Sequence, residues 1–429
     1  MFTFIRDLVN AVIAGVSDLV NLLTGRGALR PPWTWTVNSD VAAPSTNAEI
    51  DDMIKTYMQQ HAVKAGQFSL FVNGSLTMSS AYTWGESDYP LTQPSSVMRV
   101  ASCSKAFTTA AILDLMDPPA GFPILRADDK VFDILLPPST SPFPLPTDPQ
   151  VKDITVKHLL EHTGGWNYRT GPNALQDWVF HLKKIGRALH LDGPTDKKDF
   201  ATFVLCNVSL NFTPGTRPNE LFTAPGQPTK AMDTYSNIGY VLLGMIADAR
   251  ASSFIGHLNN SILHPMGISD VAVGKTRRQD ALPNEVSYES PGLGPDATRG
   301  PFDPTPASLP YGGDGSRKEV MDSGGGLIMS ANSLAKFITK HNVVLGTLDP
   351  SKTLAQLKGR QVNVTLTRDG SMPGTQAAAS TFQSKDGSRL YDMAVIFNKQ
   401  DTSKTDHGDD STDCGRLVRH MRDKIKEVF

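Results

Sequence analysis

Residues 97–116 of the chain are VMRVASCSKAFTTAAILDLM, a short apolar run followed by apolar side chains that recur at helical spacing. Ser102 and Lys105 lie where this predicted helix begins. Side chains three residues apart on a helix are neighbours, about 5–6 Å from each other. Backbone N–H groups and the positive end of the helix dipole at that position favour an alkoxide. The stretch therefore predicts a serine that is activated by a neighbouring lysine.

The spacing of this pair is not unique in the chain, because Ser333 and Lys336 repeat it. A serine at the start of a helix is also a common cap, and a lysine nearby is commonly a solvated charge. Evidence from other segments of the chain is therefore needed to distinguish a catalytic pair from an ordinary helix start.

A second polar cluster, Tyr235-Ser236-Asn237, stands at the entry to an apolar stretch that predicts a helix over residues 237–249. A tyrosine near a lysine ammonium has its phenolate favoured, whereas burial of the lysine favours the free amine. Either group could then accept the proton of a serine. The alternative is a plain cap, in which Ser236 or Asn237 bonds the free N–H groups of the helix.

A third cluster, Arg368-Asp369-Gly370, is followed by Ser371 in a stretch that is predicted to run from a strand into a turn. A glycine in an active-site strand lets the backbone approach a substrate closely. The backbone amide just beyond it could pair with the amide of Ser102 to hold an oxyanion, and such a donor contributes about 3–4 kcal/mol. The alternative is a hairpin turn with solvated charges.

Taken in order, Ser-x-x-Lys, Tyr-x-Asn and basic-x-Gly, the three clusters resemble the motifs of the serine β-lactamase-like proteins. This family includes class C β-lactamases, D-Ala-D-Ala carboxypeptidases, family VIII carboxylesterases and fungal polyketide-pathway acyltransferases. Three more segments resemble the family's opening hairpin, its His-Thr-Ser-Gly helix and its Gly-Gly-Leu helix. They are FSLFVNGSLTMSSAYTWG at 68–85, ITVKHLLEHTGG at 154–165 and DSGGGLIMSANSLAKFI at 322–338. The resemblance extends from about Ala48 to the C-terminus.

The resemblance implies an acyl-enzyme mechanism and a role for each motif residue. Ser102 would be the nucleophile, Lys105 the base that deprotonates it, and Tyr235 the group that relays the proton to the leaving atom. Asn237 would hold Lys105 or the acyl side chain. The backbone amides of Ser102 and Ser371 would form the oxyanion hole. No cofactor is implied, and the expected partner is a small-molecule acyl substrate.

The third motif departs from the family, because relatives carry Lys-Thr-Gly or His-x-Gly where this chain has Arg368-Asp369-Gly370. Arg368 could still bind a substrate carboxylate, but Asp369 would repel one. The expected substrate is therefore a neutral ester, lactone, amide or thioester, and either water or another nucleophile could accept the acyl group. A β-lactamase or D-amino-acid peptidase activity is the alternative within the family.

Two alternatives come from other classes of protein. His158, Glu161 and His162 match the inverted zinc-peptidase pattern, in which two histidines bind Zn²⁺ and the glutamate acts as a base on metal-bound water. Thr163-Gly164-Gly165 would end that helix at once. The other alternative is a non-catalytic binding module, since a fold does not determine a function.

The order of predicted elements indicates an α+β fold of the α/β-sandwich type, β-lactamase-like, with an antiparallel sheet made from both chain ends and flanked by helices. A mostly helical region is inserted between the two halves of the sheet. The predicted elements are a helix over 47–61, a hairpin at Asn73-Gly74, a helix over 156–161, a helix ending near 341, strands over 361–367 and 391–398, and a C-terminal helix.

The domain prediction follows from these elements. An N-terminal extension over 1–44, an amphipathic helix and a Pro/Trp-rich linker, precedes one β-lactamase-like domain over 45–429. Its sheet part spans about 45–100 and 318–429, and its helical and lid part spans about 101–317. Long structureless segments in a compact protein are usually lids or substrate loops. The segments expected to be loops are 136–149, 166–229 and 277–317.

The first 23 residues form the most apolar segment, and residues 5–23 place their apolar side chains on one helical stripe. We expect this amphipathic helix to pack on the body of the protein or in an oligomer interface. The alternative is contact with a membrane surface through residues 2–23. The segment lacks the pattern of a signal peptide.

Composition excludes some classes of function. A net charge of −2, without a basic cluster interleaved with aromatic residues, argues against nucleic-acid binding. The three cysteines are Cys103, Cys206 and Cys414, and their odd number and wide spacing imply neither a disulfide framework nor a metal site.

The expected location is cytoplasmic, and the protein is expected to be a biosynthetic enzyme of secondary metabolism.

Overall fold

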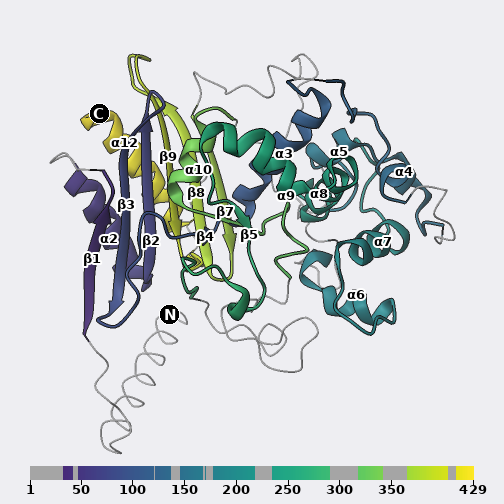
Figure 1. The fold of residues 1–429 in the computed structure, drawn as a ribbon, viewed down its shortest axis with the longest axis horizontal. Helices are drawn as coiled ribbons and strands as arrows, with labels where there is room; N and C mark the ends of the chain where they lie inside the picture. The colour runs from purple at the N-terminus through teal and green to yellow at the C-terminus, as the bar shows by residue number, and fades with distance from the viewer. Residues whose placement is uncertain are drawn as a thin grey trace, which may run out of the picture.

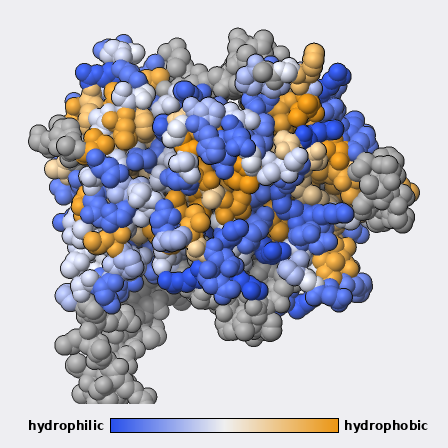
Figure 2. Space-filling view, viewed as in Figure 1, coloured by the Kyte–Doolittle hydropathy of each residue, from blue (hydrophilic) through white to orange (hydrophobic). Residues whose placement is uncertain are grey.

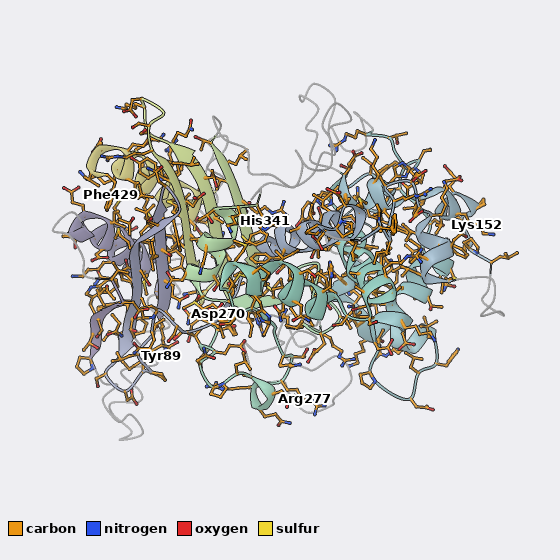
Figure 3. The ribbon with its side chains drawn as sticks, turned by 45° about the horizontal axis from the view of Figure 1, so that its top comes forward. Tyr89, Lys152, Asp270, Arg277, His341 and Phe429 are labelled. Atoms are coloured by element: carbon orange, nitrogen blue, oxygen red, sulfur yellow. The ribbon has the colours of Figure 1, made fainter. Side chains whose placement is uncertain are left out.

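The computed structural model describes residues 32–41, 47–119, 121–136, 145–167, 170, 177–217, 234–289, 317–341, 365–403 and 412–429. The amphipathic segment predicted over residues 5–23 lies outside this part of the chain. So do residues 137–144, 168–169, 171–176, 218–229 and 290–316 of the predicted loops, and residues 361–364 of the strand predicted over 361–367. Phe429 and Lys152 lie at opposite ends of the described structure, Phe429 in the half that contains the sheet and Lys152 in the helical half (Figure 3).

An antiparallel six-stranded sheet forms one half of the protein (Figure 1). Its strands are β1 (Trp33–Ser39), β2 (Ala65–Val72), β3 (Ser75–Glu86), β7 (Leu366–Met372), β8 (Thr375–Gln383) and β9 (Leu390–Phe397). They are arranged in the order β1-β3-β2-β9-β8-β7, so β2 and β9 join the early and late parts of the chain. The predicted α+β fold, with a sheet made from both chain ends, is confirmed.

The hairpin predicted at Asn73-Gly74 connects β2 and β3. Both turn residues have positive φ, 49° at Asn73 and 80° at Gly74, as a two-residue hairpin of right-handed twist requires. The Asn73 side chain also accepts a hydrogen bond from the backbone N–H of Leu390 at the start of β9, 2.9 Å away. The turn therefore fixes the β2–β3 pairing and ties it to the late part of the sheet.

Helices cover both faces of the sheet. α2 (Asn47–His61) and α12 (Asp413–Val428) pack on one face, where their apolar side chains join Phe68 and Leu70 of β2. α10 (Ala331–Ile338) packs against β2, β8 and β9 on the other face. There, the alternate β2 residue Gln67 accepts a hydrogen bond from the backbone N–H of Ala331 at 3.0 Å. Burial of both faces explains why β2 has little polar–apolar alternation in exposure.

The second half of the protein is helical and lies beside the sheet (Figure 1). At its centre is α3 (Ser104–Met116), in which every residue is buried. A helix buried on all sides belongs in the core of a large domain. Around it lie α4 (Val131–Leu135), α5 (Val156–Leu160), α6 (Leu182–Ala188), α7 (Lys197–Asn207), α8 (Asn237–Ala251) and α9 (Phe254–His257). Figure 2 shows hydrophobic residues gathered near the middle of the visible face.

Several sequence-based expectations were wrong in detail. β1 lies within the segment predicted as a linker, where WTWTV alternates along an edge strand that pairs with β3. β8 was not predicted because TQAAASTFQ is rich in alanine, and its strand conformation depends on pairing with β7 and β9. The predicted loop over 166–229 contains α6 and α7. The strand expected over 361–367 overlaps β7 only at its end, because β7 begins at Leu366 and continues to Met372.

Two smaller features complete the fold. A three-stranded sheet in the order β4-β6-β5 joins β4 (Met98–Arg99), β6 (Leu327–Met329) and β5 (Ala272–Val273). β6 connects the glycine stretch at 324–326 to α10. Among the described residues, no single helix is long and apolar enough to cross a bilayer. Asn237–Ala251 and Phe254–Met266 meet that length and composition only as a pair, which is bent by 75°.

Candidate active site

Ser102 lies in a single 3-10 turn, Ala101–Cys103, that leads from β4 into α3. The residue before it, Ala101, is buried and has a φ of 44°, in the left-handed region. This conformation costs a non-glycine residue about 1–2 kcal/mol. Ser102 itself is half-buried, whereas all of α3 is buried. The strained turn therefore places the hydroxyl at the edge of the core, where a substrate can reach it.

Lys105, one turn further along, is fully buried and surrounded by oxygen atoms. Its Nζ donates to Asn237 Oδ1 at 2.8 Å and to the backbone carbonyl of Gly324, and it lies 3.3 Å from Ser102 Oγ. A neutral amine has two N–H bonds and one lone pair. It can therefore satisfy the two acceptors and still accept the proton of Ser102.

Tyr235 approaches Ser102 from the other side. Its phenolic oxygen lies 2.7 Å from Ser102 Oγ. Arg368 Nη2 donates to the same phenolic oxygen over a longer distance of 3.5 Å. Lys105 Nζ lies 5.0 Å from the centroid of the Tyr235 ring. The serine hydroxyl is therefore in contact with two groups that can exchange a proton with it.

The surroundings shift the pKa values of both groups downward. Burial lowers the pKa of Lys105, and the charge of Arg368 lowers it further, while Tyr235 opposes this shift. Burial alone would raise the pKa of Tyr235, but the charges of Lys105 and Arg368 outweigh it, so this pKa is lowered. Both shifts increase the fraction of the basic form, free amine or phenolate, near neutral pH.

The start of α8 is held by side chains from two other segments. Ser236 caps the helix by accepting from Gly239 N at 3.2 Å. The backbone N–H of Ser236 donates to His162 Nδ1 at 3.1 Å, and that of Asn237 donates to Asp177 Oδ2 at 2.9 Å. These bonds anchor the backbone that carries the second motif. They thereby fix the positions of its phenol and amide relative to α3.

β7 runs directly against the Ser102 turn at Gly370. A Cβ atom at this position would collide with the carbonyl oxygen of Val100 and would lie 2.9 Å from the backbone nitrogen of Ser102. Only glycine therefore permits this approach. The next residue, Ser371, lines the same cavity as Ser102. The two amides assigned to an oxyanion hole thus come from segments in direct contact.

A cavity of about 310 Å³ opens at Ser102. Its lining combines polar groups from the motifs with large apolar side chains from other segments. The lining residues are Ser102, Asp177, Phe180, Tyr235, Asn237, Met321, Gly324, Gly325, Ser371 and Met372. The cavity can therefore hold a small acyl group with its carbonyl against the serine.

The structure brings all seven predicted site residues into one region, from three parts of the chain. It separates the second serine–lysine pair from them. Ser333 donates to Asp270 Oδ1, and Lys336 Nζ donates to the carbonyl of Gly267 at 3.2 Å. That pair therefore forms structural contacts along α10 and takes no part in the site.

The residues of the zinc hypothesis do not converge on one point. His158 Nδ1 accepts a hydrogen bond from the backbone N–H of Thr155 at 3.3 Å, and this bond caps α5. His162 Nδ1 accepts a hydrogen bond from the backbone N–H of Ser236. α5 ends at Leu160, and His162 has a φ of 57° beyond the helix, so the two rings do not share a helical face. In the part of the chain that the structure describes, no group of three potential ligands could hold a metal ion.

Sequence patterns did not identify several residues of the site. His162 was considered as a metal ligand and lies in the segment that resembles the His-Thr-Ser-Gly helix, but its contact with Tyr235 was not predicted. Its ring packs on Tyr235 with centroids 4.6 Å apart. Gly324 supplies a carbonyl to Lys105, and the only signal was its place in a run of three glycines. Asp177 and Phe180 lie in a stretch without a motif. Their role depends on the path of the chain between α5 and α6.

The family model for β-lactamases matches residues 50–402, which is most of the chain. The chain belongs to the β-lactamase family. This assignment places it in the serine β-lactamase-like superfamily. The probable fimbrial assembly protein FimD, serogroup H1, of Dichelobacter nodosus is 29% identical over 194 residues. That match covers 44% of this chain and 38% of the relative, so this β-lactamase-family chain spans well under half of the relative's length.

Solved structures share the β-lactamase fold at low sequence identity. The D-amino acid amidase from Ochrobactrum anthropi SV3, complexed with D-phenylalanine, has a TM-score of 0.55 at 14% identity over 90% of this chain and 100% of that one. The β-lactamase/D-alanine carboxypeptidase from Yersinia pestis has the same TM-score and identity, with coverage of 89% and 98%. The octameric penicillin-binding protein homologue from Pyrococcus abyssi has a TM-score of 0.52 at 17% identity, with coverage of 82% and 73%.

Proposed function

We propose that this protein is a serine acyl-enzyme hydrolase or acyltransferase that acts on a neutral ester, lactone, amide or thioester of a small molecule. One observation carries the proposal. Ser102 Oγ lies 2.7 Å from the phenolic oxygen of Tyr235 and 3.3 Å from Lys105 Nζ, at the wall of a cavity of about 310 Å³. A serine cap without a catalytic role would need neither contact.

The proposed reaction has two halves. Ser102 Oγ attacks the carbonyl carbon of the substrate while its proton passes to the neutral amine of Lys105. The oxyanion accepts hydrogen bonds from the amides of Ser102 and Ser371. As the intermediate collapses, the bond to the leaving group breaks, and Tyr235 delivers a proton to that group. Water or another nucleophile then attacks the acyl-serine and gives its proton to the Tyr235 phenolate. As the bond to Ser102 Oγ breaks, the Lys105 ammonium returns a proton to that oxygen.

The charge around the third motif supports a neutral substrate. The guanidinium of Arg368 is directed to the phenolic oxygen of Tyr235, and Tyr235 contributes to raising the pKa of this guanidinium. Asp369 follows it on β7 and is exposed. It places a negative charge on β7 where relatives have a neutral threonine, although Asp369 is not one of the residues that line the cavity. Phe180, Met321 and Met372 supply apolar cavity walls that suit an uncharged acyl chain.

Mass spectrometry of the intact protein after incubation with p-nitrophenyl butyrate, a thioester and a fluorophosphonate tests the mechanism. We expect a covalent adduct on Ser102 and none in Ser102→Ala. Repeating the incubation with an alcohol or amine acceptor separates acyl transfer from hydrolysis.

Three outcomes would contradict the proposal. If no acyl donor or fluorophosphonate labels Ser102, the protein is a binding module. Loss of activity with EDTA would support the zinc hypothesis instead. Faster hydrolysis of a cephalosporin than of the butyrate ester would contradict the neutral-substrate assignment.

A further inference from the structure

Asp177 is a buried carboxyl group at the wall of the cavity that the proposed mechanism does not use. It lies just before the 3-10 turn Trp178–Phe180 and is 0% exposed. Its Oδ2 accepts from the backbone N–H of Asn237 at 2.9 Å. Its Oδ1 has no hydrogen-bond partner within the described residues. A buried carboxylate oxygen without a partner carries a desolvation cost that calls for an explanation.

The neighbour of this carboxyl group is the side-chain amide that holds Lys105. Asn237 Oδ1 accepts from Lys105 Nζ at 2.8 Å, so the NH₂ end of the same amide is the end free for another partner. Burial raises the pKa of Asp177 to about 7, whereas the backbone N–H and then the side chain of Asn237 favour its ionised form. The unpartnered oxygen of Asp177 and the NH₂ end of Asn237 are therefore available to each other, while the carbonyl end of Asn237 holds Lys105.

Lys105 by itself does not determine which way the amide of Asn237 points. A neutral amine can donate to the carbonyl end, or it can accept from the NH₂ end through its lone pair. The second arrangement would occupy the lone pair that has to take the proton of Ser102. A carboxylate opposes that arrangement, because it accepts hydrogen bonds and cannot donate one.

We propose that Asp177 is a positioning residue whose carboxylate holds Asn237 with its NH₂ group toward Asp177 and its carbonyl toward Lys105, which leaves the Lys105 lone pair free for Ser102. This inference rests on the proposed function for its catalytic consequence. The contact between Asp177 and Asn237 is independent of that function, so the two can be tested apart.

Asp177→Asn is the discriminating variant, because it keeps the size of the side chain but introduces a donor. We expect the first-order rate of Ser102 labelling by a fluorophosphonate to fall about 10–100-fold, the range for a misplaced catalytic group, with little change in reversible probe binding. The matched control is Asp196→Asn, since Asp196 also accepts from a helix N-terminal amide, that of Asp199, at 2.8 Å. We expect the control to label at the wild-type rate.

A double-mutant cycle separates positioning from general structural damage. If Asp177 acts through Asn237, the variant Asp177→Asn/Asn237→Ala should label no more slowly than Asn237→Ala alone. Rate losses that multiply in the double variant would overturn the proposal. Labelling of Asp177→Asn at the wild-type rate would overturn it as well. Thermal unfolding midpoints of all variants identify any that fail to fold.

A second measurement needs no chemistry at Ser102. With ¹⁵N-labelled asparagine, the side-chain NH₂ signal of Asn237 is assigned by its loss in Asn237→Ala. We expect Asp177→Ala to shift this signal and Asp196→Ala to leave it in place. An unmoved signal in Asp177→Ala would refute the contact. If wild-type Ser102 resists every probe while the signal shifts, the proposed function fails and the positioning contact stands.

Discussion

The phenolic oxygen of Tyr235 lies 2.7 Å from the hydroxyl oxygen of Ser102, although 133 residues separate them in the sequence. α8 and α3 pack against each other in the helical half, which brings their N-terminal ends together. Burial within this packed region lowers the pKa of Lys105, and the Lys105 and Arg368 charges lower that of Tyr235. The contact between two helix starts therefore creates the site.

Replacing Tyr235 by phenylalanine removes the phenol but keeps its ring packing on His162. We expect kcat for ester hydrolysis to fall about 10²–10⁴-fold, the range for loss of a general acid–base group. Steady-state kinetics with p-nitrophenyl butyrate measure the change. Ser333→Ala, in the second serine–lysine pair, is the control and should keep wild-type kcat. Equal losses in the two variants would contradict a catalytic role for the phenol.

Replacing Arg368 by glutamine should move the pH dependence of kcat/KM to higher pH. The Arg368 charge lowers the pKa of Lys105 and of Tyr235, so its removal raises both. A higher pH is then needed to produce the free amine, and we expect the ascending limb to shift to higher pH. Arg416→Gln, which changes an exposed side chain of α12, should leave the profile in place. A shift to lower pH would refute this electrostatic role.

Replacing Asp369 by threonine should change the choice of substrate. The substitution removes a negative charge from β7 and restores the basic-Thr-Gly pattern of the relatives. We expect the ratio of cephalosporin to p-nitrophenyl butyrate hydrolysis to increase about tenfold, which corresponds to about 1.4 kcal/mol. Asp386→Thr, in the exposed turn between β8 and β9, is the control. An unchanged ratio would mean that Asp369 does not select against carboxylates.

Replacing Gly370 by alanine should damage the site through a steric effect. The added Cβ would lie 2.9 Å from the backbone nitrogen of Ser102, so β7 and the Ser102 turn must separate. We expect kcat to fall about 10²–10³-fold, as when an oxyanion donor is lost, and stability to fall by about 1–3 kcal/mol. Gly74→Ala, with nothing within 4 Å of its Cβ but a φ of +80°, tests backbone strain alone. Wild-type activity in Gly370→Ala would contradict the close approach.

Acid should destabilise the protein partly through His162. Burial holds the pKa of this imidazole well below 6.5, and the charges of Arg368 and Lys105 lower it further. Below pH 6.5 the unfolded chain binds a proton that the native protein excludes, so the free energy of unfolding falls by about 1.4 kcal/mol per pH unit. Urea unfolding at pH 7 and pH 5.5 should show a smaller loss for His162→Gln than for the wild type. Equal losses would contradict the assignment.

Local sequence rules predicted the features whose cause is local. The Asn73-Gly74 turn needs only two residues that tolerate positive φ, and α2 was predicted with the bounds Asn47–His61 that the structure has. The pair Ser102 and Lys105 is likewise local, because three residues along one turn bring the groups together. The resemblance of several motifs in order indicated the family.

Local sequence rules did not predict the features that depend on distant parts of the chain. β8 is a strand despite its alanine-rich sequence because β7 and β9 pair with it on either side. Asp177 has no motif, and its importance follows from the backbone amide of Asn237 that it meets 60 residues away. The sequence by itself determined which groups could perform acyl transfer. Only the tertiary structure decided which of them meet, because burial, strand register and the contact between helix starts bring distant residues within hydrogen-bond distance.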